Sequence, residues 1–216
     1  MHQRKILRVL DLLEPEYHNE ARPPVLGHAE PLDGLILTVL SQNTNDVNRD
    51  RAFASLKAKF PAWSDVVDAG AAELEGTIRT AGLAHTKAQR IITILGKIHA
   101  DFGDYTLKDI PRDGMKEYLR ALPGVGAKTV ACVMLFEFGM KAFPVDTHVT
   151  RVARRTGIAD RKNSPEDISV MLEGAVPVER CLGGHVNMIA HGRAVCHPQK
   201  PECAGCVLSE ICDKNL

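Results

Sequence analysis

The sequence Leu122-Pro-Gly-Val-Gly-Ala-Lys-Thr129 separates two helical segments and sets two glycines two positions apart. Gly124 and Gly126 permit a tight hairpin through backbone angles that other residues avoid. The outward-facing amides of such a hairpin, and of the next helix's first turn, form a site for a phosphate oxygen, aided by the helix dipole. A plain helix–helix turn has the same spacing, so the glycines alone leave both interpretations open.

Helical spacing of apolar residues extends outward from this hairpin over most of the chain, and strand-like alternation is almost absent. The sequence therefore predicts an all-α fold, and no long linker marks a domain boundary. The predicted helices are one opening at Pro31, one capped by Asn43 or Thr44, then 71–80, about 86–101, one ending at Leu122, 127–138, 147–156, one starting at Ser164, and about 177–191.

The overall composition gives no bulk support for nucleic-acid binding, because 27 basic residues balance 27 acidic ones in 216. Any such contact would have to use a local patch or backbone amides. The N-terminus has no uninterrupted apolar run, since Arg8 and Asp11 break it. Neither a signal peptide nor a membrane span fits, which predicts a cytoplasmic, nucleoid-associated protein with no membrane partner.

Four of the six cysteines crowd into the last stretch of the chain, as Cys196-x6-Cys203-x2-Cys206-x5-Cys212. In a reducing compartment such a cluster indicates metal ligands rather than disulfides. Four thiolates complete a tetrahedral zinc site or hold one iron–sulfur cluster, and the spacing alone does not separate the two. The remaining two, Cys132 and Cys181, lie in apolar helical patterns and are predicted to be core residues.

Two residues near the hairpin have reactive side chains. Lys128 falls in the first turn of the predicted 127–138 helix, where the dipole opposes positive charge and, with partial burial, would leave more free amine for nucleophilic attack. Its simpler interpretation is a solvated lysine on a phosphate. Asp146 precedes the predicted 147–156 helix, either as its N-terminal cap or as a carboxylate at the mouth of a cleft near Lys128.

Taken together, these residues resemble the endonuclease III family of DNA glycosylases, in the helix-hairpin-helix superfamily. The resemblance rests on the order of the hairpin with Lys128, the segment Val145-Asp-Thr-His-Val149, His191-Gly-Arg193 and the four-cysteine motif. The segment Leu40-Ser-Gln-Asn-Thr-Asn-Asp46 is similar to the family's segment that enters DNA near the flipped nucleotide. Its glutamine aligns with that segment in either of two registers. The resemblance covers nearly the whole chain.

The resemblance implies a [4Fe–4S] cluster rather than zinc, and two interleaved domains with DNA in the cleft between them. One domain would be a six-helix barrel over 31–141, and the other would join 1–30 to 142–216. The expected partner is double-stranded DNA with damaged bases or abasic sites, bound by a monomer. The implied cluster ligands are Cys196, Cys203, Cys206 and Cys212.

The implied activity is that of a bifunctional DNA N-glycosylase and AP lyase that removes oxidised pyrimidines in base excision repair. The damaged nucleotide is flipped out. Lys128 attacks C1′, expels the base and forms a Schiff base, and β-elimination nicks the strand 3′ to the lesion. Asp146 stabilises the positive charge that develops on the sugar and helps to deprotonate the nucleophile.

Further residues are expected to contact DNA. Gln42 or Asn43 would fill the vacated space, Leu83 would wedge the opposite strand, and His85 would shape the lesion pocket. For Leu83 a core leucine is the simpler interpretation, and for the arginines below an ordinary surface ion pair. The other expected contacts are Gly124, Val125, Gly126, Thr147, His148, Arg151 and Arg193.

Two alternatives remain at this point. A monofunctional mismatch glycosylase of the same superfamily generally lacks a lysine at position 128, and the adenine-mismatch enzymes usually carry an extra C-terminal domain for which Leu216, soon after Cys212, leaves no room. A non-catalytic DNA-binding module stapled by zinc would bind undamaged duplex, show no covalent trapping and be colourless.

Overall fold

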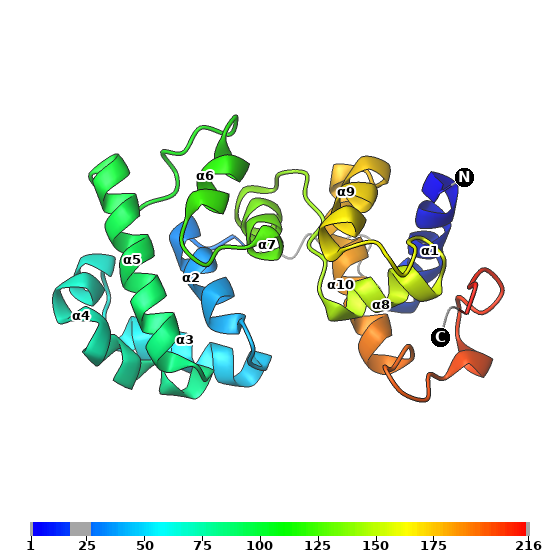
Figure 1. The fold of residues 1–216 in the computed structure, drawn as a ribbon, viewed down its shortest axis with the longest axis horizontal. Helices are drawn as coiled ribbons and strands as arrows, with labels where there is room; N and C mark the ends of the chain where they lie inside the picture. The colour runs from blue at the N-terminus through cyan, green and yellow to red at the C-terminus, as the bar shows by residue number, and fades with distance from the viewer. Residues whose placement is uncertain (1, 18–26, 215–216) are drawn as a thin grey trace. The chain divides into compact units, whose positions relative to one another are not determined.

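The computed structural model describes residues 2–17 and 27–214, and every regular element within them is helical, which confirms the predicted all-α class (Figure 1). No helix among these residues is long and apolar enough to cross a membrane. The elements in chain order are α1 (His2–Tyr17), α2 (Pro31–Ser41), α3 (Asp46–Lys59), α4 (Trp63–Thr77), η1 (Arg79–Ala81), α5 (Ala84–Phe102), α6 (Met115–Ala121), α7 (Ala127–Phe138), α8 (Thr147–Arg155), α9 (Pro165–Ala175), α10 (Val178–Ala194) and η2 (Cys203–Gly205).

The chain divides into two compact units. The central unit is Gly27–Val133, and the terminal unit joins Met1–Leu26 to Met134–Leu216. The sequence predicts 31–141 for the first unit and 1–30 with 142–216 for the second. Within the predicted 1–30 segment, residues 1 and 18–26 lie outside the described residues.

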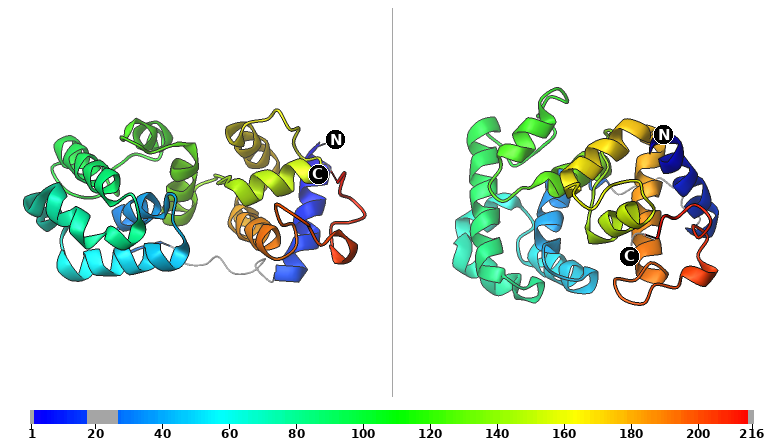
Figure 2. Two further views of the ribbon diagram at one scale, coloured as in Figure 1. Left: turned by 60° about the horizontal axis from the view of Figure 1, so that its bottom comes forward. Right: turned by 45° about the vertical axis from the view of Figure 1, so that its right-hand side comes forward.

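In the central unit, α4 packs along α5, and α3 contacts both α2 and η1 (Figures 1 and 2). The inward stripe of α5 recurs every three or four residues, as the sequence predicts, with Ile91, Ile94, Leu95 and Ile98 fully buried. Cys132 is 4% exposed and belongs to the core, as predicted. Burial of such stripes from several helices is the main force that holds the unit together.

Two helix starts in the central unit differ from the predictions. Asn45, not Asn43 or Thr44, caps α3, because its side chain accepts a hydrogen bond of 2.9 Å from the Asn48 amide. The helix predicted over 71–80 is the second half of α4, which begins at Trp63 and bends at Gly70, where φ is 77°. Trp63 is buried and donates its indole N–H to Asp33 at 2.9 Å, a tertiary contact that local spacing does not reveal.

In the terminal unit, α10 packs against α1 on one side and α8 on the other (Figure 2). Ser164 caps α9 as predicted, in a reciprocal capping box with Asp167. Cys181 is fully buried in α10, again as predicted, and this burial raises the pKa of its thiol to about 11. The N-terminal helix supplies four buried apolar side chains, namely Ile6, Val9, Leu10 and Leu13.

Candidate functional site

The glycine hairpin joins α6 to α7 in the central unit. Its turn closes through the Val125 amide, which donates to the Leu122 carbonyl at 3.2 Å, and Gly124 has a φ of 70° that favours glycine. The Val125 side chain is buried, whereas Gly124 and Gly126 are exposed. The hairpin therefore anchors itself by one apolar side chain and turns its glycine backbone outward, as a phosphate-binding site requires.

The loop after α2 is tied directly to this hairpin. The Gln42 amide nitrogen, Nε2, lies 3.4 Å from both the Gly124 carbonyl and the Thr129 hydroxyl. The Arg90 guanidinium on α5 donates to the Gln42 Oε1 and covers Gly124 so closely that a Cβ there would meet Arg90 Nε at 1.9 Å. The structure thus brings together two segments that the sequence predicted separately, through an arginine that it did not single out.

Asn43 and Leu83 each have a left-handed backbone conformation, which is strained for residues other than glycine. They are two of the four non-glycine residues with left-handed φ in the described part of the chain, at 53° and 49°. Asn43 is exposed, and Leu83 leaves 58% of its surface open, so the core interpretation of Leu83 is wrong. Strained residues of this kind persist where the surroundings impose them, often at functional sites.

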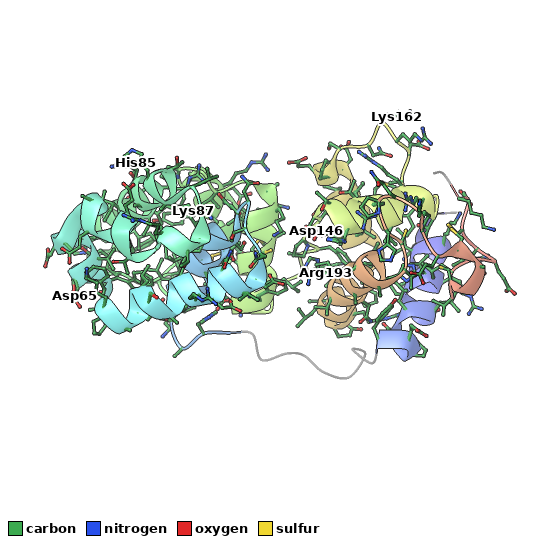
Figure 3. All side chains as sticks on the ribbon, turned by 90° about the horizontal axis from the view of Figure 1, so that it is seen from below. Asp65, His85, Lys87, Asp146, Lys162 and Arg193 are labelled. Carbon is green, nitrogen blue, oxygen red and sulfur yellow. The ribbon has the colours of Figure 1, made fainter. Side chains whose placement is uncertain are left out.

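His85 and Lys87 begin α5 in opposite environments. His85 projects from the edge of the unit, where its Nδ1 pairs with Glu75 at 2.9 Å (Figure 3). Lys87 lies within the unit and is only 2% exposed. Its Nζ donates to the carbonyls of Leu40 at 2.7 Å and Ala81 at 2.8 Å, and burial lowers the pKa of its amine, with Arg90 adding to the effect.

Lys128 is the second residue of α7, directly after the hairpin, and its side chain is exposed. The partial burial expected from the sequence is therefore absent from the free protein. Two residues before it, the Gly126 carbonyl accepts the first helical hydrogen bond, from the Val130 amide at 3.0 Å.

Asp146 belongs to the terminal unit and caps α8. Its Oδ1 accepts from the Val149 amide at 2.8 Å, so Asp146 is the N-terminal cap that the sequence predicts as one of its two roles. The side chain is half-buried, and among residues 2–17 and 27–214 nothing donates to its second oxygen, Oδ2. One oxygen thus fixes the orientation of the carboxylate while the other stays open to a ligand.

In the next turn of α8, the Arg151 side chain binds the end of α10 and does not extend into solvent. Arg151 donates to the carbonyls of Gly192 and Cys196, each at 2.7 Å, and its Nη2 lies 3.0 Å from His148 Nδ1. Most of its donors are therefore already engaged within the protein. Of the remaining predicted contacts in this unit, Thr147 and Arg193 are exposed.

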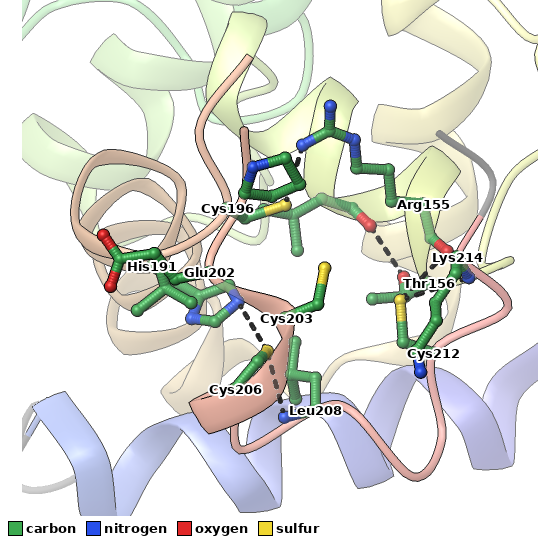
Figure 4. A pocket seen from close by; sticks show the side chains of 13 residues that line it. Arg155, Thr156, His191, Cys196, Glu202, Cys203, Cys206, Leu208, Cys212 and Lys214 are labelled. Atoms are coloured by element: carbon green, nitrogen blue, oxygen red, sulfur yellow. Dashed lines mark hydrogen bonds between the residues drawn. The ribbon is translucent and has the colours of Figure 1, made fainter. Parts of the chain in front are cut away.

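The four clustered cysteines line one pocket of the terminal unit, together with residues of α8 and α10 (Figure 4). Three of their sulfurs accept hydrogen bonds from the protein: Arg155 Nη1 donates to Cys196, the Leu208 amide to Cys206, and the Lys214 amide to Cys212, each at 3.4 Å. Donors of this kind orient thiolate ligands and tune the group they bind.

The donor set of this pocket fits a thiolate-bound metal group, because four cysteine sulfurs line it and thiolates are ligands of both zinc and iron–sulfur clusters. Burial raises the pKa of the Cys206 and Cys212 thiols, which a bound metal would deprotonate. His191, 3.5 Å from the Cys206 sulfur, is neutral near pH 7 because burial lowers its pKa to about 4.

Sequence reasoning missed Lys87 and Arg90, although a signal for both exists. Each stands four residues before a member of the buried stripe of α5, Lys87 before Ile91 and Arg90 before Ile94. A cation on the inward face of an amphipathic helix is unusual, and such a residue is a candidate for a specific polar contact.

Comparisons with known proteins find similarity to DNA glycosylases and base excision repair proteins. A family model described as HhH-GPD superfamily base excision DNA repair protein matches residues 36–177. Endonuclease III of Escherichia coli (strain K12) is 33% identical over 217 residues, covering 99% of this chain and 97% of that protein. A putative DNA glycosylase of Arabidopsis thaliana is 38% identical over 165 residues, which is 75% of this chain and 56% of that protein.

The solved structures agree with the sequence relatives. A non-covalent endonuclease III–DNA complex matches with a TM-score of 0.84 and 32% identity, over 98% of this chain and 95% of that one. A trapped endonuclease III–DNA covalent intermediate matches with the same TM-score and identity, over 98% and 96% of the two chains.

Proposed function

The chain belongs to the endonuclease III family of DNA glycosylases, within the HhH-GPD superfamily of base excision repair proteins, and we propose that it is bifunctional, with both N-glycosylase and AP lyase activity on oxidised pyrimidines in duplex DNA. The observation that carries this proposal is the exposed Lys128 amine in the first turn of α7, beside a hairpin whose backbone faces outward. Acting on such lesions would place the enzyme on the nucleoid.

Binding begins in this proposal at the DNA backbone. The amides at Gly124 and Gly126 and the dipole of α7 take a phosphate oxygen, while the Val125 amide holds the turn, and this explains how a chain of zero net charge holds DNA. Eversion of the damaged nucleotide costs a few kcal/mol. Leu83 offsets part of this cost from the opposite strand by stacking its exposed side chain against the base that has lost its partner.

Gln42 and Asn43 compete for the role of filling the vacated space. The Gln42 side chain is already bonded to the hairpin and to Arg90, whereas Asn43 is exposed. This difference supports Asn43 as the inserted residue and Gln42 as its support. Single-turnover base removal by Asn43→Ala and Gln42→Ala, compared on duplex and single-stranded DNA, separates the two roles.

The chemical steps follow from an amine and a carboxylate. The Lys128 nitrogen bonds to C1′ as the C1′–N bond to the base breaks, and the base leaves with its electron pair and takes up a proton. The C1′–O4′ bond then opens, O4′ takes a proton and becomes the 4′-hydroxyl, and C1′ is left doubly bonded to the lysine nitrogen as the Schiff base. Removal of a C2′ proton then expels the 3′ phosphate by β-elimination. The open oxygen of Asp146 stabilises the positive charge on the sugar and accepts the amine proton.

The four pocket cysteines would hold a [4Fe–4S] cluster, whose contribution is rigid thiolate ligation of the terminal loop. Donors from Arg155, Leu208 and Lys214 orient its ligands. The loop residues His197 and Lys200 then face phosphates from a fixed backbone. No catalytic step in the proposal passes through the cluster.

Borohydride trapping tests the proposal. We expect reduction during turnover to link the wild-type protein covalently to duplex DNA carrying thymine glycol, and Lys128→Gln to abolish the linkage. Lys162→Gln, which removes an exposed lysine of the terminal unit, is the matched control and should trap normally. Base release without trapping by the wild-type protein would identify a monofunctional glycosylase instead, and binding without base release would leave a non-catalytic module.

The substrate range is tested separately. A panel of duplexes carrying thymine glycol, dihydrouracil, uracil, 8-oxoguanine or an abasic site distinguishes oxidised-pyrimidine removal from mismatch and purine activities. Preference for the first two and the abasic site is the expected result. Preference for uracil or 8-oxoguanine would contradict the proposed substrate class while leaving the lysine mechanism in place.

A further inference from the structure

Lys87 is the only lysine among the buried polar residues of the described chain, and it joins two loops that are far apart in sequence. Its Nζ donates to the Leu40 carbonyl at 2.7 Å and to the Ala81 carbonyl at 2.8 Å. Leu40 lies in the last turn of α2, and Ala81 ends η1. The amine therefore sits between two helix C-termini, whose unpaired carbonyls and dipoles favour a cation.

A buried ammonium group is costly for a fold to keep unless hydrogen bonds compensate it. Here burial lowers the pKa of the Lys87 amine, and Arg90 adds a second positive charge nearby. An apolar residue would continue the inward stripe of α5 without this cost. A lysine at position 87 thus lowers stability relative to an apolar residue. This cost indicates that the hydrogen bonds of its amine serve a function other than stability.

The two linked carbonyls stand just before the two strained, exposed residues of this unit. Asn43 follows Leu40 in the loop after α2, and Leu83 follows Ala81 in the loop before α5. The residues that lead into both loops are therefore hydrogen-bonded to one ammonium group. Arg90, one turn along α5 from Lys87, ties Gln42 of the first loop and covers the hairpin at Gly124.

We propose that Lys87 is a positioning residue that fixes the two loops relative to each other, so that Asn43 and Leu83 enter a duplex together when a nucleotide is everted. This inference rests on the proposed function. Lys87 itself touches neither DNA nor the reacting atoms, because its side chain is buried. A misplacement of about 1 Å at reacting or inserting groups can lower rates by about a hundredfold.

Lys87→Met tests this role, since methionine has a similar length and no donor. We expect single-turnover base removal from a lesion duplex to fall by about a hundredfold. Nicking of an abasic site in single-stranded DNA should not change, because no opposite strand has to be displaced. The fluorescence of 2-aminopurine placed opposite the lesion, which reports eversion directly, should fall in parallel with the duplex rate. Lys87→Arg, which keeps charge and donors, should recover part of the loss.

Lys97→Met is the matched control on the same helix. Lys97 is partly exposed and pairs with Asp101 at 2.9 Å, away from both loops, so its loss should leave both substrates unaffected. Equal slowing of duplex and single-stranded substrates by Lys87→Met, with a lowered melting temperature, would show a purely structural role and overturn the proposal. If Lys87→Met does not fold, Lys87→Gln, which keeps a shorter two-proton donor, goes through the same comparison and the same criterion.

A double-mutant cycle with Leu83→Ala tests the route of the effect. If Lys87 acts through the two loops, the losses from Lys87→Met and Leu83→Ala on duplex substrate should be strongly non-additive. Additive losses would contradict the proposed coupling. Failure of the proposed function is distinguishable, because wild-type protein would then not trap at all, whereas the 2-aminopurine comparison between wild type and Lys87→Met would still report on eversion.

Discussion

Asp146 combines two duties in one side chain at the residue scale. Its Oδ1 holds the first turn of α8 through the Val149 amide, and this bond fixes where the carboxylate points. The backbone carbonyl of Asp146 also accepts from the Thr150 hydroxyl at 2.7 Å and from the Thr150 amide at 2.9 Å, so three hydrogen bonds join the start of the helix to this residue. A carboxylate held this firmly is already oriented before substrate arrives, which is the arrangement that electrostatic stabilisation of a transition state requires.

Asp146→Asn separates the two duties. Asparagine caps helices as well as aspartate does, so we expect the free energy of unfolding to change little, while base removal slows by about 10²–10⁴-fold because the charge is lost. Urea unfolding and single-turnover kinetics measure the two effects. Asp146→Ala is the companion variant and should also lose about 1 kcal/mol of stability. Full activity of Asp146→Asn would contradict a catalytic role.

At the scale of the element, the two glycines of the hairpin differ in whether a larger side chain could replace them. Gly124 needs its hydrogen side chain twice, once for the φ of 70° and once for the Arg90 guanidinium that lies over it. Gly126 has open space where a Cβ would stand. Only Gly124 therefore links the shape of the turn to the loop that holds Gln42 and Asn43.

Gly124→Ala should destabilise the central unit by about 1–3 kcal/mol, because alanine is strained in the left-handed region and would displace Arg90. Affinity for undamaged duplex should fall as well, since the phosphate-facing amides shift. Denaturant unfolding and fluorescence anisotropy with a labelled duplex measure these effects. Gly96→Ala, on an exposed helical position of α5 with open space for a Cβ, is the control and should stabilise by roughly 0.5–1 kcal/mol. A neutral Gly124→Ala would contradict the close packing.

At the scale of the whole molecule, the cysteine pocket closes the terminal unit on itself. Arg155 binds the Cys196 sulfur and the carbonyls of His197 and Pro198, and its own carbonyl accepts from Cys212. An ion pair between Lys5 and Asp213 joins α1 to the last described residues. A metal group in this pocket would therefore brace α8, the helix that Asp146 caps.

Loss of the proposed cluster should destabilise the terminal unit by about 4 kcal/mol or more, as loss of a structural metal group commonly does. Cys203→Ser is the test variant, with iron and sulfide content, visible absorbance and thermal unfolding as readouts. Cys181→Ala, which removes a buried thiol of the same unit outside the pocket, should keep its iron. A wild-type protein that carries zinc and no sulfide would contradict the cluster.

The sequence alone determined the features that depend on neighbours along the chain. The 3.6-residue periodicity is a local property of the backbone, so the all-α class and the bounds of α7 followed directly. The cap at Ser164 and the turn at Gly124 also follow from local chemistry, since each needs only a nearby amide or a permissive φ. The four clustered cysteines were recognisable for the same reason, by their spacing.

Only the tertiary structure decided which side chains meet across the chain. Lys87 bonds to carbonyls before two different loops, Arg90 bonds to Gln42 and covers Gly124, and Arg151 is engaged by the end of α10. The Trp63 indole likewise donates to the distant Asp33. Such contacts are set by how helices pack, and packing is a property of the assembled core that no local spacing encodes.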